Sequence, residues 1–337
     1  MSVIRRTSRA LGAATLAAAL IGVAVGCGSG DSSKGGGSTG SAAAKPKITM
    51  LTASNVIPGW IGYDAGAKAA AQRLGVDLKI EQWASLEPND LVAGVNAVAA
   101  SKPDAALFSA VNAPALQGAL EQAGKRIRKV ILFDSPATNQ SFAATYVGSN
   151  NAEEGVAAAK KLAELIGDKG TVLQTSAQPS FGGLEINAKA FRDEMVRNHP
   201  NINLLPLQRD DGDTAKNAAI MRATLARHPD LAGAYLGTSG LGGEGGVGAL
   251  RSAGKAGQVK VMTLDGLPAA INDLRKGYQQ AVVSTKLKDL GGGAVEDAVK
   301  ALKGEALPKQ TLVGFCVLTK DNLDQPENQQ CIFPSKK

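Results

Sequence analysis

The segment Val130–Ser135 reads VILFDS, an apolar run that ends in the carboxylate of Asp134. A strand that is buried on both faces of a sheet reads as an unbroken apolar run. A second segment, Val259–Gly266, reads VKVMTLDG and ends in the same way at Asp265. Ligands of open parallel sheets bind beyond the carboxyl ends of the strands, so we expect both aspartates to face a binding cleft. Helix capping is the alternative, because Asp accepts backbone N–H bonds at a helix start.

Strand patterns alternate with longer helical patterns from Lys47 onward. The predicted strands are Ile48–Ala53, Asp77–Gln82, Ala105–Phe108, Val130–Phe133, Thr145–Val147, Thr171–Thr175, Asn203–Leu207, Ala232–Leu236, Val259–Leu264 and Gln280–Ser284. The predicted helices include Gly59–Leu74, Asp90–Ala100, Asn151–Ile166, Gly183–Asn198, Thr214–Arg227 and Leu287–Lys303. Repeated β-α-β units specify parallel sheets with helices on both faces. The pattern therefore predicts an α/β fold with two sheets.

The composition is that of a large globular protein. A chain of 337 residues, 44% hydrophobic and 20% charged, can bury a large core, and its length favours two domains or lobes. The formal charge of +7 includes Arg5, Arg6 and Arg9 near the amino terminus. No basic run is interleaved with aromatic residues, so we expect no nucleic-acid partner.

Residues 1–26 have the pattern of a signal peptide. Arginines precede the apolar stretch Leu11–Gly26, which is too short for a comfortable membrane span. The stretch ends in Val-Ala-Val-Gly-Cys27, which resembles the bacterial lipobox, whose cysteine is diacylated. The resemblance implies a lipid anchor at Cys27, a flexible Gly/Ser-rich linker over residues 27–46, and a globular part outside the bacterial cell membrane. An ordinary secretory signal that is cleaved elsewhere is the alternative.

The remaining cysteines are Cys316 and Cys331. If Cys27 carries lipid, an oxidising compartment favours a disulfide between the other two. Two buried free thiols are the alternative.

Several segments resemble those of a known family. They are Ile48–Ala53 with Pro58-Gly-Trp60 and Gly66, then Phe133-Asp134-Ser135, Asp210-Asp-Gly-Asp213, His228-Pro-Asp-Leu, and Leu264-Asp265-Gly266 running to Gly277. Over most of Lys47–Leu318 the chain resembles a type I periplasmic binding protein of the ribose/galactose class, the solute receptor of a bacterial sugar ABC importer. The resemblance implies two Rossmann-like lobes with parallel sheets, joined by three hinge crossovers near Gly148, Thr285 and Gly314.

The implied lobes are residues 47–147 with 286–313, and residues 148–285 with 314–337, whose carboxy-terminal tail packs on the second lobe. The resemblance implies a monomer that closes around a small sugar or polyol and delivers it to an ABC transporter permease. It implies no cofactor, no metal and no catalytic residues. Surface carboxylates such as Glu153, Glu154 and Asp273 are candidates for permease contacts, although a charged residue on a helix is usually just solvated.

The expected ligand-binding residues combine hydrogen-bonding side chains with aromatic rings. Carboxylates and amides bind sugar hydroxyls, and a ring covers an apolar C–H face. The set is Asn55, Trp60, Trp83, Asp134, Ser135, Glu185, Asn187, Ser239, Asp265 and Thr285. A place in the core is the alternative for both tryptophans.

The chain departs from the family pattern at several of these positions. Relatives commonly carry Arg after the first aspartate and Gln or Asn near the tenth strand, where this chain has Ser135 and Thr285. Glu185 and Asn187 occupy the turns where relatives commonly carry another arginine. These differences imply a ligand other than ribose, which leaves a neutral polyol, another monosaccharide or a cation.

Gly240–Gly245 raises an enzyme alternative. The segment fits G-x-G-x-x-G, follows a strand, and Asp265 lies 20 residues after Gly245. This is the fingerprint of dinucleotide binding, so an exported NAD-dependent oxidoreductase is the rival function. Thr238 and Ser239 separate the first glycine from the strand end, where the tight turn should begin, so we expect a binding protein.

Other function classes have less support. The histidines, His199 and His228, each precede a proline, where helices tend to end, so we expect structural roles for them. No His, Cys and carboxylate cluster has the spacing of a metal site. A sugar-responsive repressor would need a helix-turn-helix before Lys47, whereas a sugar-responsive sensor without transport stays open.

Overall fold

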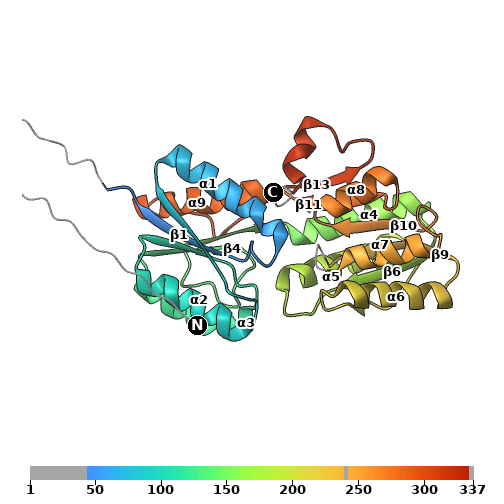
Figure 1. Ribbon diagram of the computed structural model, residues 1–337, viewed down its shortest axis with the longest axis horizontal. Helices are drawn as coiled ribbons and strands as arrows, with labels where there is room; N and C mark the ends of the chain where they lie inside the picture. The colour runs from blue at the N-terminus through green and yellow to red at the C-terminus, as the bar shows by residue number, and fades with distance from the viewer. Residues whose placement is uncertain (1–43, 239–241, 334–337) are drawn as a thin grey trace, which may run out of the picture. The chain divides into compact units, whose positions relative to one another are not determined.

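The computed structural model describes residues 44–238 and 242–333. Cys27, the signal peptide and Ser239 lie outside the described residues. The part of the chain from Ala44 onward forms one compact unit that contains two β-sheets (Figure 1). The α/β class with mostly parallel sheets is therefore confirmed.

The first sheet consists of parallel strands. In order across the sheet they are β12 (Gln310–Val313), β5 (Thr145–Ser149), β4 (Lys129–Asp134), β3 (Ala105–Phe108), β1 (Lys47–Thr52) and β2 (Asp77–Gln82). The helices that cover it are α1 (Ile61–Leu74), which follows the 3₁₀ turn η1 (Pro58–Trp60), α2 (Pro88–Ser101), α3 (Ala113–Arg126) and α9 (Leu287–Lys303). Figure 1 shows α1 and α9 on one face and α2 and α3 on the other. We call this part the first lobe.

The second sheet follows the same plan. In order its strands are β13 (Phe315–Thr319), β11 (Ala281–Thr285), β10 (Lys260–Leu264), β9 (Leu231–Leu236), β6 (Gly170–Ser176) and β7 (Ile202–Leu204), and β8 (Gln208–Arg209) also pairs with β6. Only the pairing of β13 with β11 is antiparallel within the described chain. Its helices are α4 (Asn151–Ile166), α5 (Gly182–Asn198), α6 (Thr214–Arg227), α7 (Gly243–Ser252) and α8 (Pro268–Lys276). With the tail, which includes the 3₁₀ segment η3 (Pro326–Cys331), this is the second lobe.

The described chain passes between the sheets at three points. It crosses after β5, after β11 and after β12, so that Asn150, Lys286 and Gly314 connect the lobes. The two sheet orders match strand for strand, which places β4 and β10 at corresponding positions. The fold thus brings two strand ends that carry an aspartate, Asp134 and Asp265, to equivalent places.

Two predicted features differ from the observed strands. The predicted strand Asn203–Leu207 is shorter in the structure: β7 ends at Leu204, and Pro206 separates it from β8, which begins at Gln208. A proline lacks the N–H that a ladder needs, which explains the interruption. β12 and β13 were not predicted, because they are short edge strands whose pairing depends on segments far away in sequence. β12 is largely exposed, so it lacks the apolar run of a buried strand.

Helices α1 and α9 approach closely because glycines line their contact. A Cβ atom on Gly291 would lie 2.1 Å from the carbonyl oxygen of Tyr63, and one on Gly66 would lie 2.0 Å from that of Lys288. No side chain fits at either position, so the two backbones nearly touch. This contact fixes the first turn of α1, which carries Tyr63.

Helix α4 has the predicted bounds, but its buried face is rotated from the predicted stripe. The helical spacing of its apolar residues predicts an inner stripe of Val156, Ala159, Leu162, Ala163 and Ile166. Val156 and Ile166 are only half-buried, and the buried face begins instead at Glu154 and includes Ala158. Asn150 caps the helix by accepting a bond from the Glu153 backbone N–H. The capped start directs Glu154 inward.

Candidate functional site

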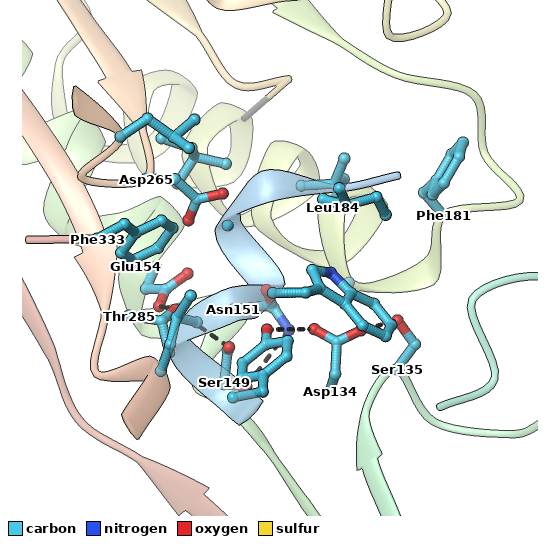
Figure 2. A pocket seen from close by; sticks show the side chains of 18 of the residues that line it. Asp134, Ser135, Ser149, Asn151, Glu154, Phe181, Leu184, Asp265, Thr285 and Phe333 are labelled. Carbon is cyan, nitrogen blue, oxygen red and sulfur yellow. Dashed lines mark hydrogen bonds between the residues drawn. The ribbon is translucent and has the colours of Figure 1, made fainter. Parts of the chain in front are cut away.

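A cavity of about 470 Å³ is lined by residues of both lobes, of the crossovers and of the tail. This volume is typical of a small-molecule site. The first lobe contributes Ile57, Gly59, Trp60, Tyr63, Val111, Asp134, Ser135 and Leu287. The crossover strands contribute Ser149 and Thr285, the second lobe contributes Asn151, Glu154, Phe181, Gly183, Leu184, Glu244, Leu264, Asp265, Leu267, Pro268 and Ala269, and the tail contributes Phe333. Figure 2 shows ten of these side chains labelled around the cavity.

Asp134 ends a strand whose central residues are fully buried. Its Oδ1 accepts a 2.6 Å hydrogen bond from the Tyr63 hydroxyl, and its Oδ2 accepts bonds from Ser109 (3.0 Å) and Ser135 (2.9 Å). Burial raises the pKa of the carboxyl, and these hydrogen bonds partly oppose the shift. The Tyr146 hydroxyl donates to the Asp134 carbonyl oxygen at 2.6 Å. The carboxylate is therefore held rigidly at the cavity wall.

Asp265 occupies the corresponding place in the second lobe. Its backbone N–H donates to the Val283 carbonyl at 2.7 Å, which keeps it aligned with β11. Its φ of 67° and that of Asp134, 64°, both lie in the left-handed region. Asp tolerates this region better than most residues. At both positions the backbone thus turns sharply at the strand end and leaves the aspartate carboxylate at the cavity.

Glu154 lies at the back of the cavity and only 3% of it is exposed. Its Oε1 accepts a 2.5 Å hydrogen bond from the Thr285 hydroxyl, which also lies 3.1 Å from the Ser149 hydroxyl. Burial raises the pKa of the Glu154 carboxyl to about 7; the bond from Thr285 lowers it and the charge of Asp265 raises it further. Figure 2 shows Glu154 between Asp265 and Thr285. Glu154 therefore lines the cavity and is not a solvated carboxylate available to a permease.

Trp60 lines the cavity although only 7% of it is exposed. Its ring packs edge-on against Tyr63, with centroids 5.3 Å apart, and against Phe133 at 5.8 Å. Trp83 does not line the cavity. Its exposed fraction is 1%, and its indole N–H donates to the Leu91 carbonyl at 3.1 Å, under α2. Trp83 therefore lies in the core of the first lobe, with its ring centroid 6.1 Å from that of Trp60.

Three more expected residues lie away from the cavity. Asn55 is exposed and donates to the Trp83 carbonyl at 2.9 Å, so it ties the first loop to β2. Glu185 forms an ion pair with Arg209 at 2.7 Å on the surface of the second lobe. Asn187 is buried and accepts a 2.7 Å bond from the Tyr235 hydroxyl. Its position on α5 places it on the side of the helix that faces the sheet, away from the cavity.

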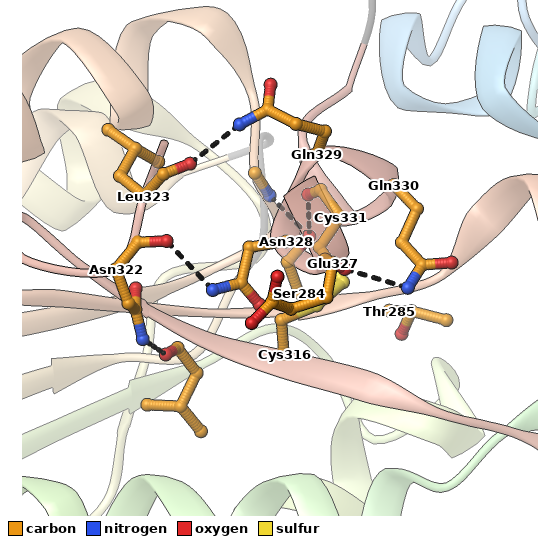
Figure 3. Close-up of a disulfide and its surroundings, with 12 residues drawn as sticks. Ser284, Thr285, Cys316, Asn322, Leu323, Glu327, Asn328, Gln329, Gln330 and Cys331 are labelled. Carbon is orange, nitrogen blue, oxygen red and sulfur yellow. Dashed lines mark hydrogen bonds between the residues drawn. A yellow bond between two sulfur atoms is a disulfide. The ribbon is translucent and has the colours of Figure 1, made fainter. Parts of the chain in front are cut away.

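The tail reaches the cavity through a disulfide between Cys316 and Cys331 (Figure 3). Ser284 donates to the Cys331 carbonyl at 2.6 Å and accepts from the Gly266 N–H at 2.9 Å. The Phe333 N–H donates to the Gly266 carbonyl at 2.8 Å. A Cβ on Gly266 would lie 2.2 Å from the Cys331 carbonyl oxygen, so the tail rests directly on the loop that carries Asp265.

Phe333 joins the tail to the first lobe. It is buried among the hydrophobic residues of that lobe, and a Cβ on Gly59 would lie 3.2 Å from its ring. The rest of the tail packs on the second lobe, where Cys331 and Leu323 are buried beside α8. The tail therefore contacts both lobes and supplies one wall of the cavity.

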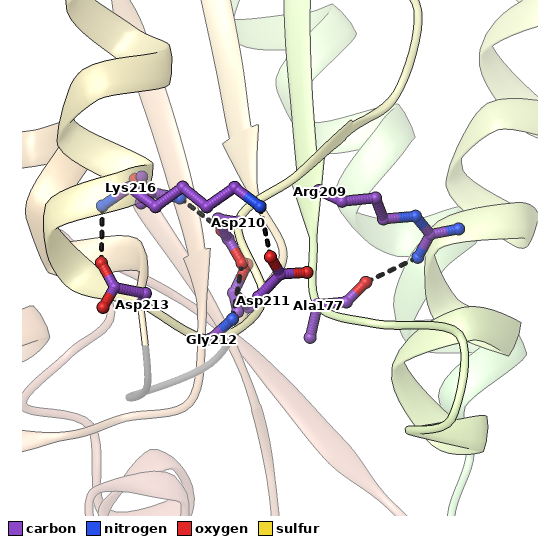
Figure 4. Close-up of polar contacts among 9 residues, drawn as sticks. Ala177, Arg209, Asp210, Asp211, Gly212, Asp213 and Lys216 are labelled. Carbon is purple, nitrogen blue, oxygen red and sulfur yellow. Dashed lines mark hydrogen bonds and ion pairs between the residues drawn. The ribbon is translucent and has the colours of Figure 1, made fainter.

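The Asp210–Asp213 segment is structural (Figure 4). Asp210 is fully buried and accepts bonds from Asn217 at 2.6 Å, from the Gly212 N–H at 3.1 Å and from Thr238. Asp213 caps α6 by accepting a 2.6 Å bond from the Lys216 N–H. These carboxylates hold the loop before α6 and do not line the cavity.

Sequence reasoning missed several cavity residues, among them Tyr63, Asn151, Glu154, Phe181, Glu244 and Phe333. A signal existed for Glu154, which shares a helix face with Ala158 and Leu162 at a spacing of four residues. No sequence signal marked Phe333 as a cavity residue, because it follows the last predicted helix or strand.

Within residues 44–238 and 242–333, no cluster of His, Cys, Asp and Glu has the arrangement of a metal site. No helix of that part is both long and apolar enough to cross a membrane.

Comparisons with known proteins agree with this geometry. The family model described as "Periplasmic binding protein domain" matches residues 48–306. The ribose import binding protein of Salmonella typhimurium is 25% identical over 264 residues, which cover 78% of this chain and 87% of the relative. The D-apiose import binding protein of Actinobacillus succinogenes is 24% identical, with 76% and 81% covered.

Solved structures show the same fold. An ABC transporter solute-binding protein from Agrobacterium vitis, bound with α-D-tagatopyranose, superposes with a TM-score of 0.80 at 28% identity. The match covers 86% of this chain and 100% of that protein. Together with the family match, the paired lobes and their shared cavity show that the chain belongs to the periplasmic binding protein domain family and is a type I periplasmic binding protein.

Proposed function

We propose that this protein is an extracytoplasmic receptor that captures a small sugar or polyol in the cavity and delivers it to the permease of an ABC transporter. The observation that supports this most directly is the cavity itself, whose walls come from both lobes. Closure of such lobes around a ligand would exclude water and create a form that a permease can distinguish. Relatives that import ribose and D-apiose, and the tagatose-bound neighbour, support a sugar as the ligand class.

The side chains suit a hydroxylated ligand. Carboxylates at two strand ends, Asp134 and Asp265, can accept hydrogen bonds from hydroxyls, and Ser135 and Asn151 add further polar groups. Trp60 offers an aromatic surface for an apolar sugar face. The roles of these residues, and the lobe boundaries that would act as hinges, are part of the proposal.

A thermal-shift screen tests the receptor function, because a ligand that binds only the folded state raises the melting temperature. The panel is D-ribose, D-apiose, D-tagatose, D-arabinose and neutral polyols, followed by calorimetric titration of the compounds that stabilise the protein. We expect at least one of them to bind. Failure of the whole panel together with micromolar binding of NAD would favour the oxidoreductase alternative instead.

We further propose that a lipid on Cys27 anchors the mature protein to the outer surface of the cell membrane. The apolar stretch before Cys27 and the Gly/Ser-rich segment after it support this. Mass spectrometry of the membrane fraction should find diacylated Cys27 at the amino terminus. A soluble protein with an unmodified amino terminus would contradict the anchor.

A further inference from the structure

The cavity has an unbalanced charge. Asp134, Glu154, Glu244 and Asp265 line it, and no lysine, arginine or histidine does so among the described residues. Sugar hydroxyls can donate to carboxylates, but they leave the negative charge in place. A positively charged group on the ligand would compensate it.

The carboxylates differ in how well the protein itself satisfies them. Both oxygens of Asp134 already accept hydrogen bonds, from Tyr63, Ser109 and Ser135. Glu154 accepts only the bond from Thr285 at its Oε1, and no donor of the described chain reaches its Oε2. Only 3% of Glu154 is exposed, so its carboxylate is largely shielded from the bulk solvent. Its open position faces the cavity (Figure 2).

Two other buried acids of the described chain have a cation nearby, whereas Asp64 and Asp210 accept hydrogen bonds from neutral donors instead. Asp297 is 5% exposed, and the Lys300 ammonium lies 3.1 Å from its carboxylate. Glu194 is 8% exposed, with Lys160 and His199 nitrogens 3.9 Å away. Glu154 is more buried than either and forms no ion pair with a described residue. A buried carboxylate without a cation is unfavourable unless it is protonated or paired.

The remaining walls suit a ligand with both hydroxyls and a cation. Aromatic rings of Trp60, Phe181 and Phe333 line the cavity, and such rings attract ammonium groups through their faces. Ser149 and Thr285, beside Glu154, are positioned to bind a neighbouring hydroxyl. Together they would place an ammonium group and a hydroxyl side by side at the back of the cavity.

We propose that the ligand is a hydroxylated compound with a protonated amine, such as an amino sugar, and that Glu154 is its counter-ion. This rests on the proposed receptor function and specifies its ligand class. The Glu154 carboxylate would accept hydrogen bonds from the ammonium group through Oε2, while Thr285 holds Oε1. The charge of Asp265, which acts on Glu154, would strengthen the attraction.

The test compares pairs of compounds in which an amine replaces an oxygen. In D-glucosamine and D-glucose, and in D-galactosamine and D-galactose, the amine replaces a hydroxyl; in 1-deoxynojirimycin and 1,5-anhydro-D-glucitol it replaces the ring oxygen. Calorimetric titration of the purified protein at pH 7, where the amines remain substantially protonated, gives the affinities. We expect the amine to bind at least tenfold more tightly than its neutral partner in at least one pair. This comparison needs no variant, so it stays decisive even where a variant folds poorly.

Glu154→Gln keeps the shape of the side chain and removes its charge. It should weaken amine binding at least tenfold and neutral-sugar binding less than threefold. Glu153→Gln, on the exposed side of the same helical turn, is the matched control and should change neither. Equal losses for both members of a pair would overturn the counter-ion role.

The outcomes separate the two proposals. If neutral sugars bind as tightly as the amines in every pair, or if only the neutral sugars of the receptor screen bind, the amine inference fails and the receptor function stands. If no member of any pair and no compound of the receptor screen binds, both fail.

Discussion

Asp134 and Asp265 end corresponding strands of the two lobes, and both adopt a left-handed backbone, with φ of 64° and 67°. A positive φ is uncommon for a residue with a side chain. Its occurrence at matched positions of the two sheets shows that both lobes end a buried strand at the cavity with the same left-handed backbone conformation. The carboxylate appears where the chain leaves the sheet, and the strand residues before it are buried from Val130 and from Val261 onward.

Removing either strand-end carboxylate should weaken ligand binding. We expect Asp265→Ala to reduce binding by about 1–3 kcal/mol, which is typical of a lost hydrogen bond to a charged group. Asp134→Ala should also destabilise the fold, because the hydroxyls of Tyr63, Ser109 and Ser135 lose their acceptor. Calorimetry and urea denaturation measure the two effects separately. Unchanged affinity in both variants would remove these aspartates from the site.

The two tryptophans provide a matched pair for fluorescence. The chain has two, and only Trp60 lines the cavity. We therefore expect a ligand-induced change in emission to survive in Trp83→Phe and to disappear in Trp60→Phe. Trp83→Phe also leaves the Leu91 carbonyl without its indole donor, so its main effect should be on stability. A full signal in Trp60→Phe would show that the ring does not report on the ligand.

Ionisation of Glu154 should lower stability as the pH rises from 5 to 8. Burial raises the pKa of its carboxyl from 4.5 to about 7, so the folded protein holds a proton that the unfolded chain has already lost. The free energy of unfolding then falls with pH until Glu154 ionises in the folded state too. The total effect is about 3 kcal/mol, at about 1.4 kcal/mol per pKa unit. Urea denaturation at pH 5, 6, 7 and 8 without ligand measures it.

Variants assign this slope to a residue. Glu154→Gln cannot ionise, so its profile should be flatter than that of the wild type, and Glu153→Gln should keep the wild-type slope. The other ionisable groups facing Glu154 are Asp265 and the phenols of Tyr146 and Tyr235. Burial raises the pKa of both phenols, so they stay neutral over this range. Equal slopes in the wild type and Glu154→Gln would show that this carboxyl does not titrate there.

The disulfide-closed tail should affect both stability and binding. Replacing Cys316 and Cys331 with Ser opens a loop with a sequence separation of 15 and should lower the free energy of unfolding by about 3 kcal/mol. Affinity should fall too, because the tail positions Phe333 at the cavity. Phe333→Ala keeps the disulfide, so it should weaken binding by a similar factor while leaving the contribution of the disulfide to stability in place. If the double variant binds as well as the wild type, the tail is only a structural clamp.

The sequence by itself determined the fold class. The strand patterns Val130–Phe133 and Val259–Leu264 fall on the strands β4 and β10, and the helical pattern of Asn151–Ile166 matches α4. Strand and helix patterns depend on side chains a few residues apart, so they can be read locally. The strand-end aspartates were predictable for the same reason, because the end of an apolar run marks the edge of the sheet.

The tertiary structure alone decided which side chains face the cavity. Both tryptophans follow strands, yet Trp83 turns under α2 and only Trp60 reaches the cavity. Glu154 meets Thr285 across 131 residues of chain, and Phe333 arrives from a tail held by a disulfide. Such contacts between distant residues depend on the rotation of each helix about its axis and on the path of the crossovers. These are set by packing between distant segments, which no local pattern records.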